Sequence, residues 1–269
     1  MRADRRLRDR LRPPRRDSEG AAEASSAHAA ADSHATLEQH AAFFRTFGAL
    51  RVPGLFVAEI DAISRAFDDV FREHPAEEAD PRYSLHRPKD PESGAPRRQI
   101  PANAAIQSGD PFGFIERSEA LVWLKDDARV TELARALLGD GCRYDGSVGN
   151  IFNSYIYWHS DYFRNDVSSQ RQLKLAFYLD ELDGGSGALR VMPGTNHLGA
   201  YRESIYDEAR SPDPGELERR YGVAEDELPC WTIASKPGDV VVFDNTTLHA
   251  NFNGGSHRRM FSLQFVQEW

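Results

Sequence analysis

Hydrophobic residues recur with two different periods along the chain. Between residues 37 and 73, apolar side chains return at helical spacing, and Gly48 and the pair Pro53-Gly54 interrupt them. This pattern predicts a helix, a short strand and a second helix. A further helical pattern runs over residues 118–138 and ends at glycine. We therefore expect the N-terminal part to be mainly helical.

The period changes to two from about residue 143 onward. Short segments rich in β-branched and aromatic residues are separated by turn residues, and they cover 147–160, 172–182, 187–194, 238–251 and 257–269. Several short strands after a helical part predict an α+β chain that is mainly β. The expected architecture is a β-sandwich or barrel buttressed by N-terminal helices.

Three stretches fall outside this pattern. Residues 1–36 are rich in Arg and Ala with almost nothing to bury, which predicts a disordered extension before a domain over 37–269. Residues 75–112 are crowded with Pro, Gly and charge, and residues 199–230 form a polar, acidic insertion. We expect both to shape a substrate site, the insertion as a partly helical lid.

Charge and cysteine content exclude several classes of protein. The net charge is −9, and beyond the eight arginines and two aspartates of residues 1–16 the chain has 25 basic and 40 acidic residues, which argues against nucleic-acid binding. No apolar run approaches the roughly 20 residues that cross a bilayer. Only Cys142 and Cys230 are present, which argues against a disulfide framework and favours a reducing cytoplasm.

Three residues carry the pattern of a metal site. His159 and Asp161 lie two positions apart in a strand-like run, so their side chains are expected on one face. His249 follows the apolar strand 240–243 and offers a third ligand. Two imidazoles and one carboxylate are typical of the facial triad that holds non-haem Fe(II) with open positions. A structural zinc site would need a fourth protein ligand, and none is evident.

An arginine near the last strand suggests a cosubstrate. Arg258 shares a strand face with Met260, Ser262 and Gln264, opposite Phe261, Leu263 and Phe265. A buried guanidinium needs an acidic partner, and its planar fork suits a dicarboxylate.

These segments together resemble the phytanoyl-CoA dioxygenase-like family of Fe(II)/2-oxoglutarate oxygenases. The matching pieces, in family order over about residues 38–269, are FFRTFGALRVPGLF, YWHSDYF, LKLAFYLDEL, GALRVMPGTNHLG, KPGDVVVFDNTTLH and RRMFSLQF. The resemblance implies a double-stranded β-helix, or jelly roll. It also implies a dioxygenase that uses Fe(II), 2-oxoglutarate and O2 to oxidise a small molecule, either free or carrier-bound. Succinate and CO2 would be released.

Carried over residue by residue, the resemblance implies that His159, Asp161 and His249 bind iron. Arg258 would bind the distal carboxylate of 2-oxoglutarate, with Arg259 as the fallback because the spacing from His249 is slightly short for the family. Four further residues are expected to line the pocket: Asn153, Gln172, Lys174 and Arg190. The presence of Asp161 points to hydroxylation, since family halogenases have a small residue there.

Other readings stay open at this point. The same iron centre could catalyse desaturation, epimerisation or cyclisation, which only product analysis separates. A non-catalytic jelly-roll binding protein would have no reason to assemble the full triad with Arg258. A zinc hydrolase with the same ligands would need a general base that the sequence does not supply. The sequence specifies neither the substrate nor the oligomeric state.

Overall fold

The computed structural model describes residues 36–73, 113–152, 156–161, 170–197, 222, 227–252 and 258–268. All of these ranges belong to one compact unit, Thr36–Trp269. The predicted extension, apart from Thr36, the loop over 75–112 and nearly all of the insertion over 199–230 lie outside the described residues. Among the helices that are described, none combines the length and the apolar character that crossing a membrane requires.

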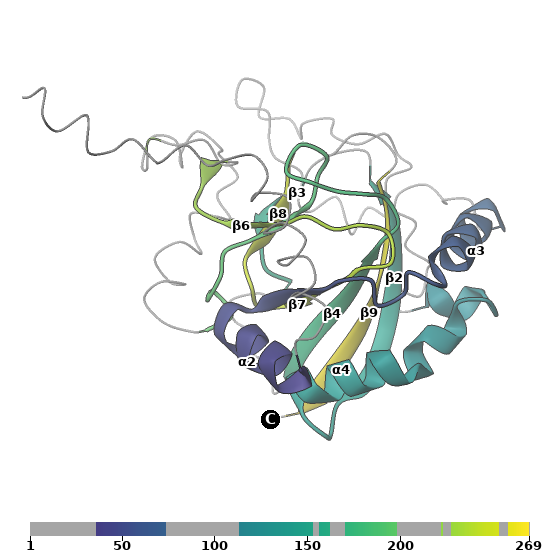
Figure 1. The fold of residues 1–269 in the computed structure, drawn as a ribbon, viewed down its shortest axis with the longest axis horizontal. Helices are drawn as coiled ribbons and strands as arrows, with labels where there is room; N and C mark the ends of the chain where they lie inside the picture. The colour runs from purple at the N-terminus through teal and green to yellow at the C-terminus, as the bar shows by residue number, and fades with distance from the viewer. Residues whose placement is uncertain are drawn as a thin grey trace, which may run out of the picture. The chain divides into compact units, whose positions relative to one another are not determined.

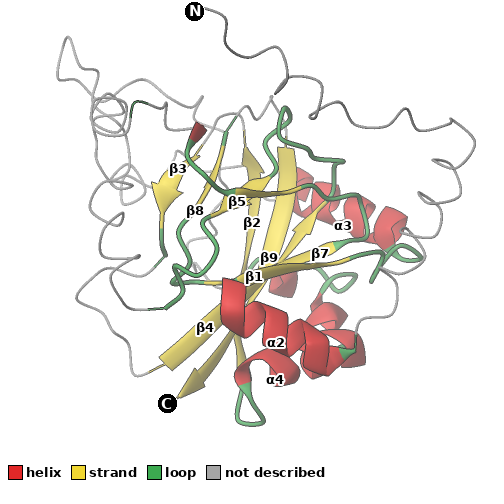
Figure 2. Cartoon of the chain, turned by 60° about the vertical axis from the view of Figure 1, so that its left-hand side comes forward, coloured by secondary structure: helices red, strands yellow, loops and turns green. Residues whose placement is uncertain are grey.

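Two antiparallel sheets form the body of the described unit (Figure 2). The larger sheet has the strand order β1-β7-β4-β9-β2 and the smaller one β3-β8-β5-β6. The strands are β1 (Ala49–Val52), β2 (Arg143–Phe152), β3 (Ile156–His159), β4 (Gln170–Tyr178), β5 (Leu189–Val191), β6 (Trp231–Ile233), β7 (Val240–Asp244), β8 (His249–Asn251) and β9 (Arg258–Glu268). The sequence pattern did not predict β6, which directly follows the polar insertion over 199–230.

Helices cover the outer face of the larger sheet (Figure 1). They are α2 (Leu37–Phe47), α3 (Ile60–Glu73) and α4 (Ala128–Leu138), with 3-10 turns at Ile115–Arg117 and Val122–Asp126. The predicted helix-strand-helix order over 37–73 is confirmed. The prediction of one helix over 118–138 is wrong in its first half, since Asp127 accepts the backbone N–H of Arg129 and caps a helix that begins at Ala128.

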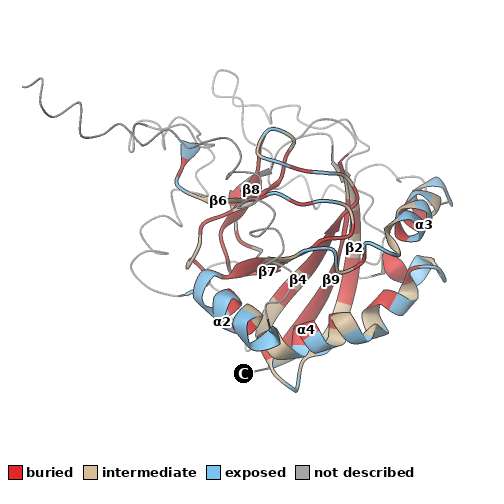
Figure 3. Ribbon diagram, in the orientation of Figure 1, coloured by how far each residue is buried: buried red, intermediate tan, exposed pale blue. Residues whose placement is uncertain are grey.

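The larger sheet has two different faces, as period-two alternation requires. Its outward side chains pack with the helices, and on β9 they are Phe261, Leu263 and Phe265. Its inward side chains, which include Tyr178, Phe243 and Met260, pack against Leu189 and Val191 of the smaller sheet. Figure 3 shows this burial along β4, β7 and β9. The predicted division of β9 into two faces is confirmed.

The end of α2 is docked on the turn that precedes β8. Gly48 ends the helix with φ 79°, and its carbonyl accepts a hydrogen bond of 3.1 Å from the hydroxyl of Thr247. A Cβ at position 48 would collide with Thr247 and Asn196. Only glycine allows this backbone conformation and this close approach together, and so α2 helps to fix the start of β8.

Candidate metal centre

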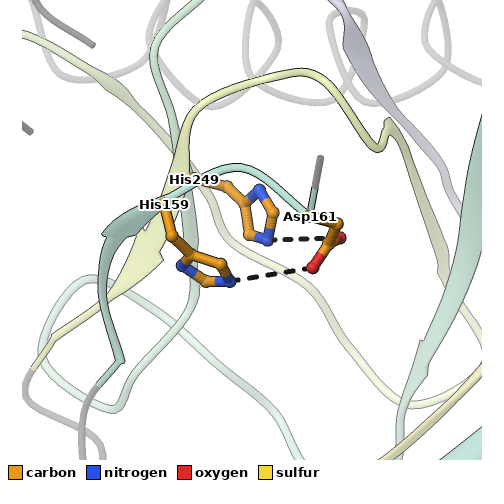
Figure 4. A group of neighbouring side chains, drawn as sticks. All are labelled: His159, Asp161 and His249. Atoms are coloured by element: carbon orange, nitrogen blue, oxygen red, sulfur yellow. Dashed lines mark ion pairs between the residues drawn. The ribbon is translucent and has the colours of Figure 1, made fainter. Parts of the chain in front are cut away.

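The three predicted metal ligands meet where β3 and β8 pair. His159 is the last residue of β3 and lies opposite His249, the first residue of β8, with their ring centroids 4.2 Å apart. Asp161 follows β3, and its backbone N–H donates to the carbonyl of Asn245 over 2.9 Å. Figure 4 shows the three side chains pointing toward one another.

The distances between their donor atoms suit a shared ion. Asp161 Oδ1 lies 3.8 Å from His159 Nε2, and Asp161 Oδ2 lies 3.7 Å from His249 Nε2. One donor atom from each residue can be chosen so that all three lie within 4.8 Å of one another. Bonds of about 2.0–2.2 Å from a central ion to nitrogen and oxygen place neighbouring donors about 3 Å apart, so a bound ion would draw this set inward. The donor set of two imidazoles and one carboxylate fits Fe(II).

The ring of His249 is held in the tautomer that a metal ligand needs. Its Nδ1 lies 2.8 Å from the carbonyl oxygen of Thr247. A carbonyl can only accept, so Nδ1 carries the proton and the lone pair of Nε2 faces Asp161. Burial lowers the pKa of His249 and outweighs the opposing charge of Asp161, which keeps the imidazole neutral.

Asp161 is kept ionised by its neighbours. Lys174 on β4 donates a hydrogen bond of 2.8 Å from Nζ to Asp161 Oδ2. Burial acts to raise the pKa of Asp161, but the charge of Lys174 and its hydrogen bond act in the opposite direction, and the pKa lies below its ordinary value. Lys174 was predicted to line the pocket, and its ammonium group in fact contacts the carboxylate of the triad.

Gln172 contributes to the same region by supporting a turn. Its backbone carbonyl accepts the N–H of Asn245 over 3.1 Å, and its side-chain oxygen accepts the Asn245 amide over 2.9 Å. Asn245 in turn anchors Asp161. The sequence gives no signal for Asn245 and Thr247, because both act on the ligands through backbone carbonyls, which every residue type carries.

Arg190 lies on the other face of the smaller sheet. It pairs with Ala250, whereas its neighbour Val191 pairs with His249. Its guanidinium carbon lies 5.3 Å from the ring centroid of Phe252, in an apolar cluster away from the triad. The structure thus places Arg190 on the face opposite to His249, and its role in lining the pocket stays a prediction. Asn153 lies outside the described residues, so its role stays a prediction.

The two arginines that begin β9 have different surroundings. Arg258 is 3% exposed and donates to the carbonyl of Gly187 over 2.9 Å, and burial lowers its pKa. The guanidinium of Arg259 contacts Asp68 on α3 and Asp180 in the bend after β4, each at 2.9 Å. Because two carboxylates already bind Arg259, it is poorly suited to bind the carboxylate of a cosubstrate. The geometry therefore favours Arg258 for that role.

Comparison with known proteins gives matches over most of the chain. The family model of phytanoyl-CoA dioxygenase matches residues 44–260. The ectoine dioxygenase of Stutzerimonas stutzeri is 27% identical over 230 residues, which cover 77% of this chain and 68% of that protein.

Two solved structures share the fold. The non-heme alpha-ketoglutarate-dependent carbocyclase SnoK from nogalamycin biosynthesis aligns with a TM-score of 0.60 and 18% identity, covering 87% of this chain and 86% of that one. EctD from S. alaskensis, solved with 2-oxoglutarate and 5-hydroxyectoine, aligns with a TM-score of 0.56 and 24% identity, covering 85% and 75%. The predicted jelly roll is confirmed. The chain belongs to the phytanoyl-CoA dioxygenase family and is an Fe(II)- and 2-oxoglutarate-dependent dioxygenase.

Proposed function

We propose that residues 37–269 form a domain that hydroxylates a small organic molecule and releases succinate and CO2. In this proposal His159, Asp161 and His249 hold the iron, and Arg258 binds the distal carboxylate of 2-oxoglutarate. The observation that carries it is the cross-strand pair of histidines with Asp161 facing both rings, their donor atoms within 4.8 Å. Bound Fe(II) supplies the redox chemistry that couples decarboxylation of 2-oxoglutarate to oxidation of the substrate.

The residues around the triad would prepare the site for this chemistry. The carbonyl of Thr247 fixes the tautomer of His249. Lys174 orients the side chain of Asp161, and the carbonyl of Asn245 holds its backbone. Arg258 would meet the charge of the cosubstrate inside the protein, where a guanidinium interacts strongly with a carboxylate. Hydroxylation is favoured over halogenation because Asp161 occupies the position of the carboxylate ligand.

The test is a spectrum followed by product analysis. Fe(II) and 2-oxoglutarate, added without oxygen, should give a weak visible charge-transfer band in the wild type and none in Asp161→Ala. Candidate substrates that stimulate succinate release should then gain one oxygen atom by mass spectrometry. Loss of two hydrogens, or an isomer of unchanged mass, would instead indicate desaturation, cyclisation or epimerisation. A wild type with neither the band nor turnover of 2-oxoglutarate would contradict the proposal.

Two further expectations belong to this proposal. A carrier-bound substrate stays a prediction. Measuring succinate release with the free and the carrier-bound form of one compound shows which form the enzyme accepts. A reducing cytoplasm stays a prediction from the cysteine content, and Cys142 and Cys230 are both free thiols.

A further inference from the structure

Gln264 carries an amide group on the inner face of β9. The residue is only 9% exposed, and it lies on the same strand face as Arg258 and Met260. In the part of the chain that the structure describes, its amide makes no hydrogen bond. Buried side-chain amides nearly always have partners, and an amide without one lowers the stability of the folded protein. This side chain therefore calls for a partner that the protein itself does not provide.

The register of the larger sheet places Gln264 at the level of the metal centre. It lies directly opposite Lys174 on β4, and both side chains face inward. The Lys174 ammonium in turn lies 2.8 Å from Asp161 Oδ2. Gln264 is also six positions beyond Arg258, which corresponds to about 20 Å along an extended strand. The amide thus belongs to the metal end of β9 and not to the region around Arg258.

The neighbouring strands leave the amide of Gln264 uncommitted. Its partner on β2 is Gly146, which has no side chain and adjoins a register shift in that strand. A glycine inside a strand often marks a place where a ligand approaches the backbone closely. On β4, the diagonal neighbour Gln172 already accepts the side-chain amide of Asn245 over 2.9 Å. A molecule that enters beside the metal could therefore bind the Gln264 amide.

An amide group selects its partner because it presents a donor and an acceptor side by side. The NH2 of Gln264 can donate and its carbonyl oxygen can accept. A carboxylate would leave this carbonyl without a donor, and an ammonium would leave this NH2 without an acceptor. A second amide satisfies both groups through two parallel hydrogen bonds. Sites built around buried polar groups discriminate strongly against partners that leave them unpaired.

We propose that Gln264 binds the organic substrate, and that the group which it binds is an uncharged amide, as in a carboxamide or a lactam. This inference rests on the proposed function, in which a small molecule is oxidised at the iron that the triad holds. It identifies a specificity-determining residue of the substrate site, and it names the chemical class of the group that this residue recognises.

The first experiment compares three probes that share one carbon chain. Hexanamide, hexanoate and hexylamine are each titrated without oxygen into the full chain loaded with Mn(II) and 2-oxoglutarate. Paramagnetic broadening of the NMR signals of the probe reports binding close to the metal. We expect the wild type to bind hexanamide about 10-fold more tightly than the other two, because only the amide satisfies both ends of the Gln264 side chain.

Two substitutions should change this preference in different ways. Gln264→Met keeps the length of the side chain but removes both polar groups, so it should bind hexanamide about 10-fold more weakly, as for two lost neutral hydrogen bonds. The other two probes should bind as before. Gln264→Glu replaces the NH2 with a second acceptor oxygen, and it should bind hexylamine more tightly than hexanamide. A purely structural role for Gln264 would not produce this exchange of preference.

A second glutamine supplies the matched control for stability. Gln172→Met removes the acceptor of the Asn245 amide and should lower the urea midpoint of unfolding of the metal-free protein. Gln264→Met should instead raise this midpoint, because it replaces a buried amide that has no partner with an apolar side chain of similar shape.

Several results would overturn the inference. They are equal binding of hexanamide by the wild type and Gln264→Met, an equal weakening of all three probes in that variant, and a wild type that prefers hexanoate or hexylamine. A urea midpoint that falls in Gln264→Met would likewise show that its amide has a partner within the protein. In each case the proposed function stands if Asp161→Ala loses Mn(II) binding. Undiminished Mn(II) binding by Asp161→Ala would contradict the proposed function itself.

Discussion

His159 lies directly opposite His249 across the paired strands β3 and β8, and their ring centroids are 4.2 Å apart. Asp161 faces both rings from the turn after β3. The relative position of the two imidazoles is thus set by strand register. Ligands on regular elements are held more accurately than ligands on loops, and the backbone bonds of Thr247 and Asn245 add to this support.

Removal of one ring should abolish tight metal binding. In His249→Ala, we expect the affinity for Mn(II) to fall by at least about 100-fold, since changes in the outer partners of a metal site alone cost about 10- to 100-fold. Calorimetric titration of the metal-free protein measures this. His40→Ala on α2 is the control, and its affinity should match that of the wild type. Equal affinities in all three proteins would exclude His249 as a ligand.

Loss of the Lys174 ammonium should destabilise the metal-free protein. In Lys174→Met, Asp161 keeps its burial but loses its 2.8 Å ion pair. Because the Asp161 side chain is 23% exposed, we expect a loss of only about 1–2 kcal/mol in the free energy of unfolding. Urea titrations with and without Mn(II) measure it. The metal should stabilise the variant more than the wild type, and an equal gain in both would contradict this account of Lys174.

A methyl group at Gly48 should disturb the metal centre from a distance. Gly48→Ala adds a collision with Thr247 to the strain of a positive φ, so we expect a loss of about 2–4 kcal/mol and weaker Mn(II) binding. Gly54→Ala is the matched control, because its φ is 63° and nothing lies within 4 Å of the added Cβ. It should lose about 1 kcal/mol and bind Mn(II) normally. Thermal unfolding and calorimetry separate the two effects.

The two arginines of β9 should give opposite phenotypes. Arg258→Gln is expected to raise the KM for 2-oxoglutarate by about 10- to 100-fold with little change in stability, since it removes charged donors from the proposed carboxylate site. Arg259→Gln should leave this KM unchanged and lower the free energy of unfolding by about 1 kcal/mol, because it loses partly exposed ion pairs to Asp68 and Asp180. The reversed pattern would identify Arg259 as the cosubstrate ligand.

The start of α4 should make stability depend on pH. The hydrogen bond from Arg129 lowers the pKa of Asp127 from its ordinary value of 3.8, against the opposing effect of burial. The stabilisation by the ionised Asp127 carboxylate is therefore complete above the pKa that this group has in the unfolded chain. It is lost as the pH falls through the lower pKa that the group has in the folded protein. Asp127→Asn keeps the cap and removes the charge. The variant should be about 0.5–1 kcal/mol less stable at neutral pH and should match the wild type well below pH 3.8 in urea titrations.

The elements that could be predicted from the sequence are those in which a pattern within one segment determines the structure of that segment. Alternation along β9 was long enough to assign both faces, and the order of Gly, Pro and helical spacing gave α2, β1 and α3. The sequence was not sufficient where the environment of a residue comes from a neighbouring strand. Arg190 stands in a three-residue strand, too short to reveal which face turns inward, and the contact of Lys174 with Asp161 depends on the packing of the two sheets.

The divided faces of β9 have an evolutionary consequence. The side chains that pack on the helices, Phe261 and Leu263 among them, join β9 to the helical layer, whereas Arg258 and Met260 face the space between the two sheets. Inward substitutions can therefore leave the contacts with the helices unchanged. One strand in this way lets inherited architecture stay constant while the chemistry that it houses diversifies.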